Sequence, residues 1–178
     1  MLTRHFPLPV KFFASLIYTS EDLYQKAKKE LIKIGGALDY ESERFEFTFT
    51  EYYCHEMGKP LFRRFIVFRR LRNPEYLVVL KIASMRIERT YARQKRRSVN
   101  IDPGYLNEAK LVLATTKDFY HRLYLGKGIY AEVTLCYQDK AFCSFPTTYP
   151  DYKSQSHLAL FHTIRELYRA QIHDVLKK

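Results

Sequence analysis

The feature that most constrains the fold is an almost uninterrupted apolar run near the beginning of the chain. Residues Val10–Tyr18 read VKFFASLIY, a pattern typical of a β-strand buried inside a protein. Thr19 or Ser20 then supplies an N-cap for a helix that Gly35-Gly36 ends. The apolar positions of this helix recur at helical spacing and are Leu23, Ala27, Leu31 and Ile34.

Two further strands and a second helix are predicted next. Phe45–Phe49 alternates aromatic and polar residues, and Leu61–Phe68 is apolar in its middle, so both segments are predicted strands. Asn73-Pro74-Glu75 combines an N-cap, a first-turn proline and a first-turn acid, which predicts the start of a helix. The run Tyr76–Ile82 is also apolar enough to form a strand instead, and both alternatives remain open at this point. The buried stripe of the helix would be Tyr76, Leu80, Ala83, Ile87 and Tyr91.

The second half of the chain is predicted to consist mainly of strands, closed by a helix. In chain order we expect a turn at Asp102-Pro103-Gly104, a short strand at Leu111–Thr115, a hairpin of His121–Leu125 with Ile129–Tyr137, a turn near Asp139-Lys140 and a strand at Ala141–Phe145. The final helix follows Pro146 and Pro150, and its core positions are Leu158, Phe161, Ile164, Tyr168, Ile172 and Val175.

This order of elements predicts an α+β fold. We expect a single domain over residues 1–178, with a mostly antiparallel sheet, helices packed on one of its faces and a C-terminal helix. A ferredoxin-like arrangement of the first elements is compatible with the order. No apolar run approaches the ~20 residues that span a bilayer, so we expect no membrane partner. The polar start MLTRHFP does not resemble a signal peptide, which together with only three cysteines leads us to expect a cytoplasmic protein.

Almost all of the excess positive charge lies in one segment. The chain has a formal charge of +11, and residues 63–97 hold twelve basic and two acidic residues, a net charge of +10. On a helix, Arg86, Arg89 and Arg93 would share one face, while Arg63 and Arg64 belong to a predicted strand. One hypothesis is therefore an RNA- or DNA-binding module in which these arginines contact phosphates. The alternative is a solvated surface that keeps the protein soluble.

The hairpin can be aligned by asking which of its residues share a buried face. Opposite residues on paired strands point to the same side of a sheet, so the loop must have an odd length, and Gly126-Lys127-Gly128 satisfies this. In this register His121 lies on the apolar face opposite Val133. The expected pairs are Leu125 with Ile129, Tyr124 with Tyr130, Leu123 with Ala131, and Arg122 with Glu132. The buried side would comprise Leu123, Leu125, Ile129, Ala131 and Val133.

The predicted pair of Arg122 and Glu132 has two interpretations. An exposed cross-strand ion pair would contribute only ~0–1 kcal/mol to stability. A guanidinium and a carboxylate held rigidly beside tyrosines in a cleft would instead form a functional site. We leave both interpretations open here.

The cysteine, histidine and glycine patterns indicate no metal or cofactor. Cys136 and Cys143 oppose each other if the turn is Asp139-Lys140, but a reducing compartment favours two buried thiols. Cys54-His55 lacks a second pair of ligands at zinc spacing. Gly126-Lys127-Gly128 is not followed by a helix, as a phosphate-binding loop would require.

Three blocks of the sequence resemble an uncharacterised prokaryotic family known as domain of unknown function 4416. The longest block is residues 100–138, and the others are FTFTEYYCHEMG at 47–58 and TYPDY at 148–152. With PVKFF at 9–13, the resemblance covers nearly the whole chain. It implies a stand-alone cytosolic protein of this size, without implying an activity. It draws attention to the polar residues of the blocks, most of which lie outside the basic segment 63–97.

We therefore expect a protein that binds a small anionic or phosphorylated ligand, with nucleic-acid binding and a homo-oligomeric structural role as alternatives. Acids, bases and tyrosines are concentrated in residues 102–132, at strand ends and in short turns. The candidates for moving protons are Glu132, His121 and Asp118. The candidates for binding the ligand are Lys110, Lys117, Arg122, Lys127, Asp102 and Tyr152. The candidates for binding a nucleic acid are Arg63, Arg64, Arg86, Arg89 and Arg93.

Overall fold

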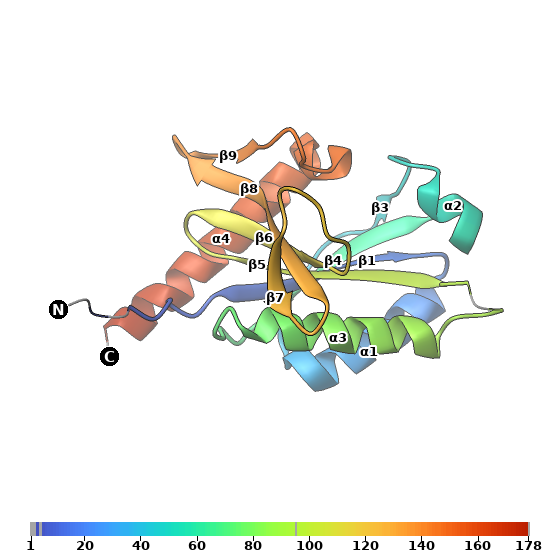
Figure 1. The fold of residues 1–178 in the computed structure, drawn as a ribbon, viewed down its shortest axis with the longest axis horizontal. Helices are drawn as coiled ribbons and strands as arrows, with labels where there is room; N and C mark the ends of the chain where they lie inside the picture. Colours follow the sequence, from blue (N-terminus) through green and yellow to red (C-terminus); the bar gives the residue numbers. More distant parts are fainter. Residues whose placement is uncertain (1–2, 4, 95, 178) are drawn as a thin grey trace.

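The fold is built on one antiparallel sheet, described by a computed structural model for residues 3, 5–94 and 96–177 (Figure 1). Lys95 of the basic segment and residues 1, 2 and 4 of the polar start lie outside the described residues. The described elements are β1 (Lys11–Tyr18), α1 (Glu21–Gly35), β2 (Leu38–Glu41), β3 (Phe45–Glu46), α2 (Tyr52–Met57), β4 (Phe62–Phe68), α3 (Tyr76–Thr90), β5 (Val99–Leu106), β6 (Lys110–Thr115), β7 (Leu123–Gly126), β8 (Ile129–Gln138), β9 (Ala141–Ser144), the 3-10 helix η1 (Pro150–Lys153) and α4 (Gln155–Leu176).

The first part of the sheet has the ferredoxin-like strand order. The strands run β2-β4-β1-β5, and β1 pairs antiparallel with both β4 and β5. Helix α1 connects β1 to β2, and α3 connects β4 to β5. This is a β-α-β-β-α-β unit, which confirms the arrangement considered from the sequence. The sheet then continues through β6, β8 and β7.

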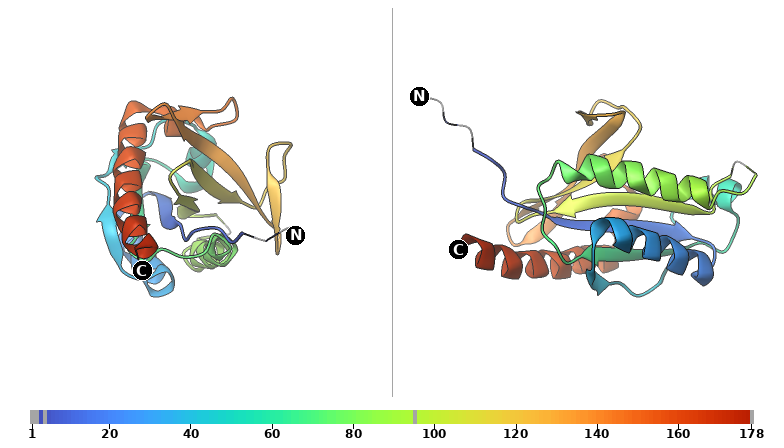
Figure 2. Two further views of the ribbon diagram at one scale, coloured as in Figure 1. Left: turned by 90° about the vertical axis from the view of Figure 1, so that its left-hand side faces the viewer. Right: turned by 90° about the horizontal axis from the view of Figure 1, so that it is seen from below.

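The two faces of the sheet are covered by different helices. In β1, Phe12, Ala14 and Leu16 pack with α1 and α3, whereas Phe13 packs with α4. Successive residues of a strand point to opposite faces, so the apolar run of β1 is buried on both sides. The α+β class, the antiparallel sheet and the C-terminal helix are confirmed. The expectation of helices on one face holds for α1 and α3, but α4 lies on the opposite face (Figure 2).

Local capping signals place the first two long helices. The Ser20 hydroxyl accepts a hydrogen bond from the backbone nitrogen of Leu23, and Gly36 ends α1 with a φ of 94°. Segment 76–82 forms the start of α3 and not a strand, so the helical alternative is the correct one. The carbonyl oxygen of the Asn73 side chain accepts from the backbone of Glu75 at 3.0 Å, in the turn that leads into this helix.

The predicted turn at Asp102-Pro103-Gly104 is wrong, because these residues lie inside β5. β5 pairs with β6 only through Gly104–Leu106, so the earlier part of β5 has a free edge. The backbone nitrogen of Ile101 faces away from β1 and donates to Glu88. The backbone nitrogen of Pro103, two residues later, faces the same side and has no hydrogen to donate. A proline is therefore tolerated in the strand because that side requires no ladder hydrogen bond.

Two other expectations about the core need correction. The alternating run Phe45–Phe49 forms a strand only at Phe45–Glu46, and Phe49 is exposed. In α4, Phe161, Ile164, Tyr168 and Ile172 are buried as predicted, but Val175 is 47% exposed. Val175 lies in the last turn of α4, at the carboxyl end of the helix that extends beyond the sheet (Figure 2).

Two positions of the predicted α4 stripe offer a direct test of this packing. Phe161→Ala is expected to lower the free energy of unfolding by about 3–5 kcal/mol, because it empties a fully buried ring site. Val175→Ala on the same helix is expected to cost less than about 0.5 kcal/mol. Urea unfolding of both variants measures the two costs, and similar values would contradict the placement of α4.

Candidate functional site

The β7–β8 hairpin has a different turn from the predicted one. Tyr124 pairs with Tyr130 and Leu123 with Ala131 as predicted, but Ile129 pairs with Gly126 instead of Leu125. Gly126 has a φ of 100° at an irregularity in the ladder, and the turn itself is Lys127-Gly128, with φ values of 54° and 74°. Two turn residues with positive φ match the twist of paired strands, and the extra strand residue forms a bulge.

The predicted buried face of this hairpin is only partly correct. Ile129 and Ala131 are buried, but Leu123, Leu125 and Val133 are exposed, with Leu123 at 73%. The hairpin stands out from the body of the molecule, so no described helix or strand covers its outer strand (Figure 2). The alternation of apolar and polar residues does not predict the exposure of Leu123, because it is interpreted on the assumption that the apolar side of a strand packs against the core.

Glu132 is a buried carboxylate that receives two hydrogen bonds on one oxygen. Its Oε2 lies 2.8 Å from Nε of Arg122 and 3.0 Å from Nε2 of His121. The predicted contact between Arg122 and Glu132 is therefore confirmed. The placement of His121 opposite Val133 is wrong, because β7 begins only at Leu123 and leaves His121 in the preceding turn.

Arg122 uses every nitrogen of its guanidinium inside the protein. Besides Glu132, it donates to the backbone carbonyl of Lys117 at 3.0 Å and to the hydroxyl of Tyr149 at 3.1 Å. Burial raises the pKa of Tyr149, so its hydroxyl stays protonated and accepts this bond. Arg122 thus ties the 116–122 segment to β8 and to the residues before η1, which favours a positioning role for it.

Asp102 belongs to a second polar group at the free edge of β5. Lys81 of α3 donates to its Oδ1 at 3.1 Å, and Asn100 donates to its Oδ2 at 2.6 Å. Burial opposes ionisation of Asp102, but Lys81 and Asn100 outweigh it and hold the pKa of the carboxyl below its usual value. Both backbone polar groups of Ile101 are hydrogen-bonded to α3. Its nitrogen donates to Glu88, and its carbonyl oxygen accepts from Lys81.

Arg97 continues this group toward α2. It donates from Nε and Nη2 to the two oxygens of Glu56, at 2.9 and 2.7 Å, in a bidentate pair. Its Nη1 donates to Oδ1 of Asn100 at 2.6 Å. A continuous chain of hydrogen bonds therefore runs from Glu56 through Arg97, Asn100 and Asp102 to Lys81.

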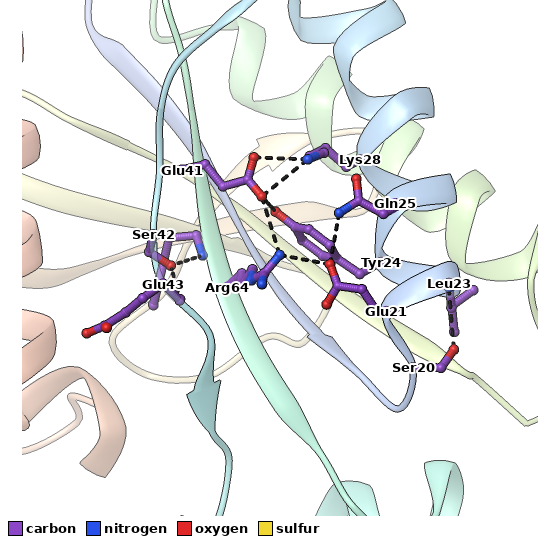
Figure 3. A network of polar contacts seen from close by, with 11 residues as sticks. Ser20, Glu21, Leu23, Tyr24, Gln25, Lys28, Glu41, Ser42, Glu43 and Arg64 are labelled. Atoms are coloured by element: carbon purple, nitrogen blue, oxygen red, sulfur yellow. Dashed lines mark hydrogen bonds and ion pairs between the residues drawn. The ribbon is translucent and has the colours of Figure 1, made fainter.

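Two arginines predicted to contact nucleic acid are committed inside the protein. Arg63 is only 4% exposed, forms an ion pair with Asp151 and lies over the ring of Phe47 at 4.6 Å. Arg64 pairs with Glu21 and Glu41, as Figure 3 shows. Arg63 is therefore buried away from any external phosphate, whereas Arg64 stays partly exposed with its guanidinium paired to acids of the same chain.

The remaining predicted residues do not gather in one place. Lys117 lies over the ring of Tyr52 at 5.2 Å, and Asp118 is exposed beside it in sequence. Tyr152 is buried close to Arg63, with its ring 5.6 Å from that guanidinium, and burial raises its pKa. Lys127 is in the β7–β8 turn. Lys110 is the first residue of β6 and pairs with Cys136 of β8.

Cys136 and Cys143 face each other across β8 and β9, as the predicted Asp139-Lys140 turn requires. Both thiols are free, but they are half-buried and not fully buried as expected. Among the described residues, no three His, Cys, Asp or Glu side chains gather in a way that could hold a metal ion. None of the described helices is both long enough and apolar enough to cross a membrane.

A groove that sequence reasoning missed lies where the ends of α1, α2 and α3 approach one another. It has a volume of about 600 Å³ and is lined by the cationic residues Lys26, Arg93, Arg96 and Arg97 and by the acidic residues Asp22 and Glu56. Leu23, Met57 and Tyr91 add an apolar part. The RQKR run at 93–96 was the available signal, but only the fold brings α1 and α2 against it.

Arg93 and Arg96 are held side by side at this groove. Their backbones exchange two hydrogen bonds, from the Arg93 nitrogen to the Arg96 carbonyl at 2.9 Å and in the reverse direction at 2.8 Å. Directly opposed residues of an antiparallel pair project to the same face, where like charges repel. Neither side chain makes an ion pair with any residue that the structure describes. Both side chains are exposed at the groove and therefore remain available to an anion.

Comparison with known families places the chain. The profile of a family described as a domain of unknown function (DUF4416) matches residues 8–168. The chain belongs to the DUF4416 family. Neither a curated protein nor a solved structure matches it. In this DUF4416 protein, the three blocks at 47–58, 100–138 and 148–152 meet in space, since Lys117 lies over Tyr52 and Arg122 bonds Tyr149.

The Glu132 pair can be tested by removing its carboxylate. Glu132→Ala is expected to lower the free energy of unfolding by about 3–5 kcal/mol, because it leaves a buried guanidinium short of its main partner. Glu51→Ala removes an exposed partner of Lys59 and is the matched control, expected to cost far less than Glu132→Ala. Chemical denaturation gives both values. An equally small loss for Glu132→Ala would refute the positioning role of the pair.

His157 predicts a loss of stability in acid. Burial among aromatic rings lowers its pKa from 6.5 to about 4, and its Nδ1 donates to the carbonyl of Asp151 at 2.6 Å. The unfolded chain therefore takes up this proton first as the pH falls, and up to about 3 kcal/mol of stability is lost between about pH 6.5 and pH 4. Denaturation of the wild type and His157→Phe at pH 7 and pH 4.5 should show a smaller loss in the variant. Equal losses of stability in the wild type and in His157→Phe would contradict this prediction.

Proposed function

We propose that this protein binds a small anionic, phosphate-bearing molecule in the groove between α1, α2 and α3. The observation that carries the proposal is the opposed pair of Arg93 and Arg96, whose backbone bonds hold two like charges together at the groove. Such an arrangement costs free energy in the empty protein and is repaid when an anion lies between the two guanidinium groups.

The rest of the groove suits the same class of ligand. Ser20 at the start of α1 lines it, and the amino end of a helix carries a partial positive charge. The guanidinium of Arg97 is immobilised by Glu56, so one side of the groove is already ordered before a ligand arrives. A volume of about 600 Å³ lies within the ~300–1,000 Å³ of typical ligand sites. Leu23, Met57 and Tyr91 offer apolar contact to a non-phosphate part of the molecule.

The proposal is tested by calorimetric titration with pyrophosphate and with adenosine monophosphate. Arg93→Glu/Arg96→Glu is expected to weaken binding at least about 100-fold, as loss of two charged hydrogen-bond donors at ~1.5–3 kcal/mol each implies. Arg86→Glu/Arg89→Glu makes the same change in net charge on the exposed surface of α3, outside the groove lining, and should weaken it less than about threefold.

Three outcomes would overturn the proposal. One is the absence of heat of binding with either probe at millimolar concentration. Another is an equal loss of affinity in the two double variants, which would indicate nonspecific attraction to the basic segment. The last is unchanged affinity in Arg93→Glu/Arg96→Glu, which would place the anion elsewhere.

Nucleic-acid binding is a second candidate, supported by the exposed positions of Arg86 and Arg89 on α3 and of Arg93, which lies past the end of the helix at Thr90 and not on it as predicted. A phosphate backbone lying along this helix would contact all three, and its affinity would fall steeply with salt. Arg86→Glu/Arg89→Glu is therefore the deciding variant for this candidate. It should abolish a gel shift of single-stranded RNA at low salt while leaving pyrophosphate binding intact. A gel shift that survives the substitutions, or none with the wild type, argues against it.

A further inference from the structure

Seven large apolar side chains gather on and beside the projecting β7–β8 hairpin. Each is between 41% and 79% exposed, and Figure 2 shows that the hairpin stands clear of the body of the protein. Soluble monomers rarely expose contiguous apolar patches of this kind without a partner for them. The seven side chains are Phe119, Tyr120, Leu123, Tyr124, Leu125, Val133 and Tyr149.

Among the residues that the structure describes, no strand neighbours the outer edge of β7. β7 pairs with β8 on one side only and ends the sheet. Its residues Leu123–Gly126 carry no charge and no proline, the usual devices that keep a sheet edge from pairing with another chain. The backbone groups on that edge are thus open to a second strand.

We propose that β7 pairs with β7 of a second copy of this chain, so that the hairpin is a homodimer interface. Leu123-Tyr124-Leu125 reads the same in both directions. An antiparallel pair with a two-fold axis at Tyr124 therefore places tyrosine against tyrosine and leucine against leucine in both halves. This self-complementarity identifies a second copy, in preference to an unrelated protein, as the occupant.

The exposed apolar area and the positions of the charges are consistent with a second copy of this chain at the β7 edge. At the ~150–250 Å² of a large side chain, the seven exposed fractions offer at most roughly 700 Å² per copy, against the ~800 Å² that each partner gives to a standard interface. The two-fold register sets Lys127 of one copy opposite position 121 of the other, and not against a second Lys127. No like charges are forced together on the paired strands.

Light scattering on a sizing column tests the proposal across micromolar protein concentrations. The wild type is expected to have twice the monomer mass. Leu123→Lys/Leu125→Lys should weaken the dimer at least about tenfold and yield the monomer, because it places charges on both halves of the interface. Val79→Lys/Leu176→Lys changes two equally exposed apolar side chains elsewhere and should leave the dimer intact.

Cross-linking checks the register independently. With Cys54, Cys136 and Cys143 replaced by serine, Tyr124→Cys should form a disulfide-linked dimer with a mild copper-phenanthroline oxidant, since residues on the axis face each other. Tyr120→Cys in the same background lies away from the axis and should not. A wild-type monomer at every concentration, a dimer that survives Leu123→Lys/Leu125→Lys, or linking at position 120 in preference to 124 would overturn the proposal. The groove variants do not bear on it.

Discussion

The arrangement of this protein depends on how the free edge of β5 is satisfied. β6 pairs with β5 only from Gly104 onward, so the backbone of Ile101 lies inside the protein without a strand on the side away from β1. A buried donor or acceptor without a partner costs free energy comparable to a lost hydrogen bond. Glu88 and Lys81 of α3 supply the missing partners. This contact fixes α3 against the sheet and leaves Lys81 in position to bond Asp102.

The same contact orders the groove. Asp102 holds Asn100, Asn100 holds Arg97, and Arg97 holds Glu56 of α2. Each member of this chain is a charged or strongly polar group that would be unfavourable in the interior alone, and each is satisfied by the next. Arg97 and Glu56, which line the groove, are therefore held in place by hydrogen bonds that start at the free edge of β5. Among the described cationic residues that line the groove, only Arg93 and Arg96 remain without an acidic partner, since Lys26 pairs with Asp22 and Arg97 with Glu56.

Local patterns predict the elements well and their surroundings poorly. Val10–Tyr18, the Ser20 cap and the pair of Arg122 with Glu132 follow from the sequence, because strand burial, capping and cross-strand pairing act between near neighbours. The burial of Arg63, the exposure of Leu123 and the path of β5 through Pro103 depend on elements distant in sequence. The groove residues belong to three helix ends whose contact no local pattern encodes.

The positive charge of residues 63–97 illustrates why net charge alone does not identify a function. Arg63, Arg64, Lys81 and Arg97 come from this segment, and all four are neutralised by carboxylates elsewhere in the chain. Their positive charges pair with buried or partly buried carboxylates, which would be unfavourable there without a partner. What distinguishes Arg93 and Arg96 from them is not charge but geometry, since a backbone pairing keeps the two cations together without a counterion from any described residue. A binding site for an anion is therefore identified by unpaired cations that the backbone holds next to one another, and not by the total charge of the segment.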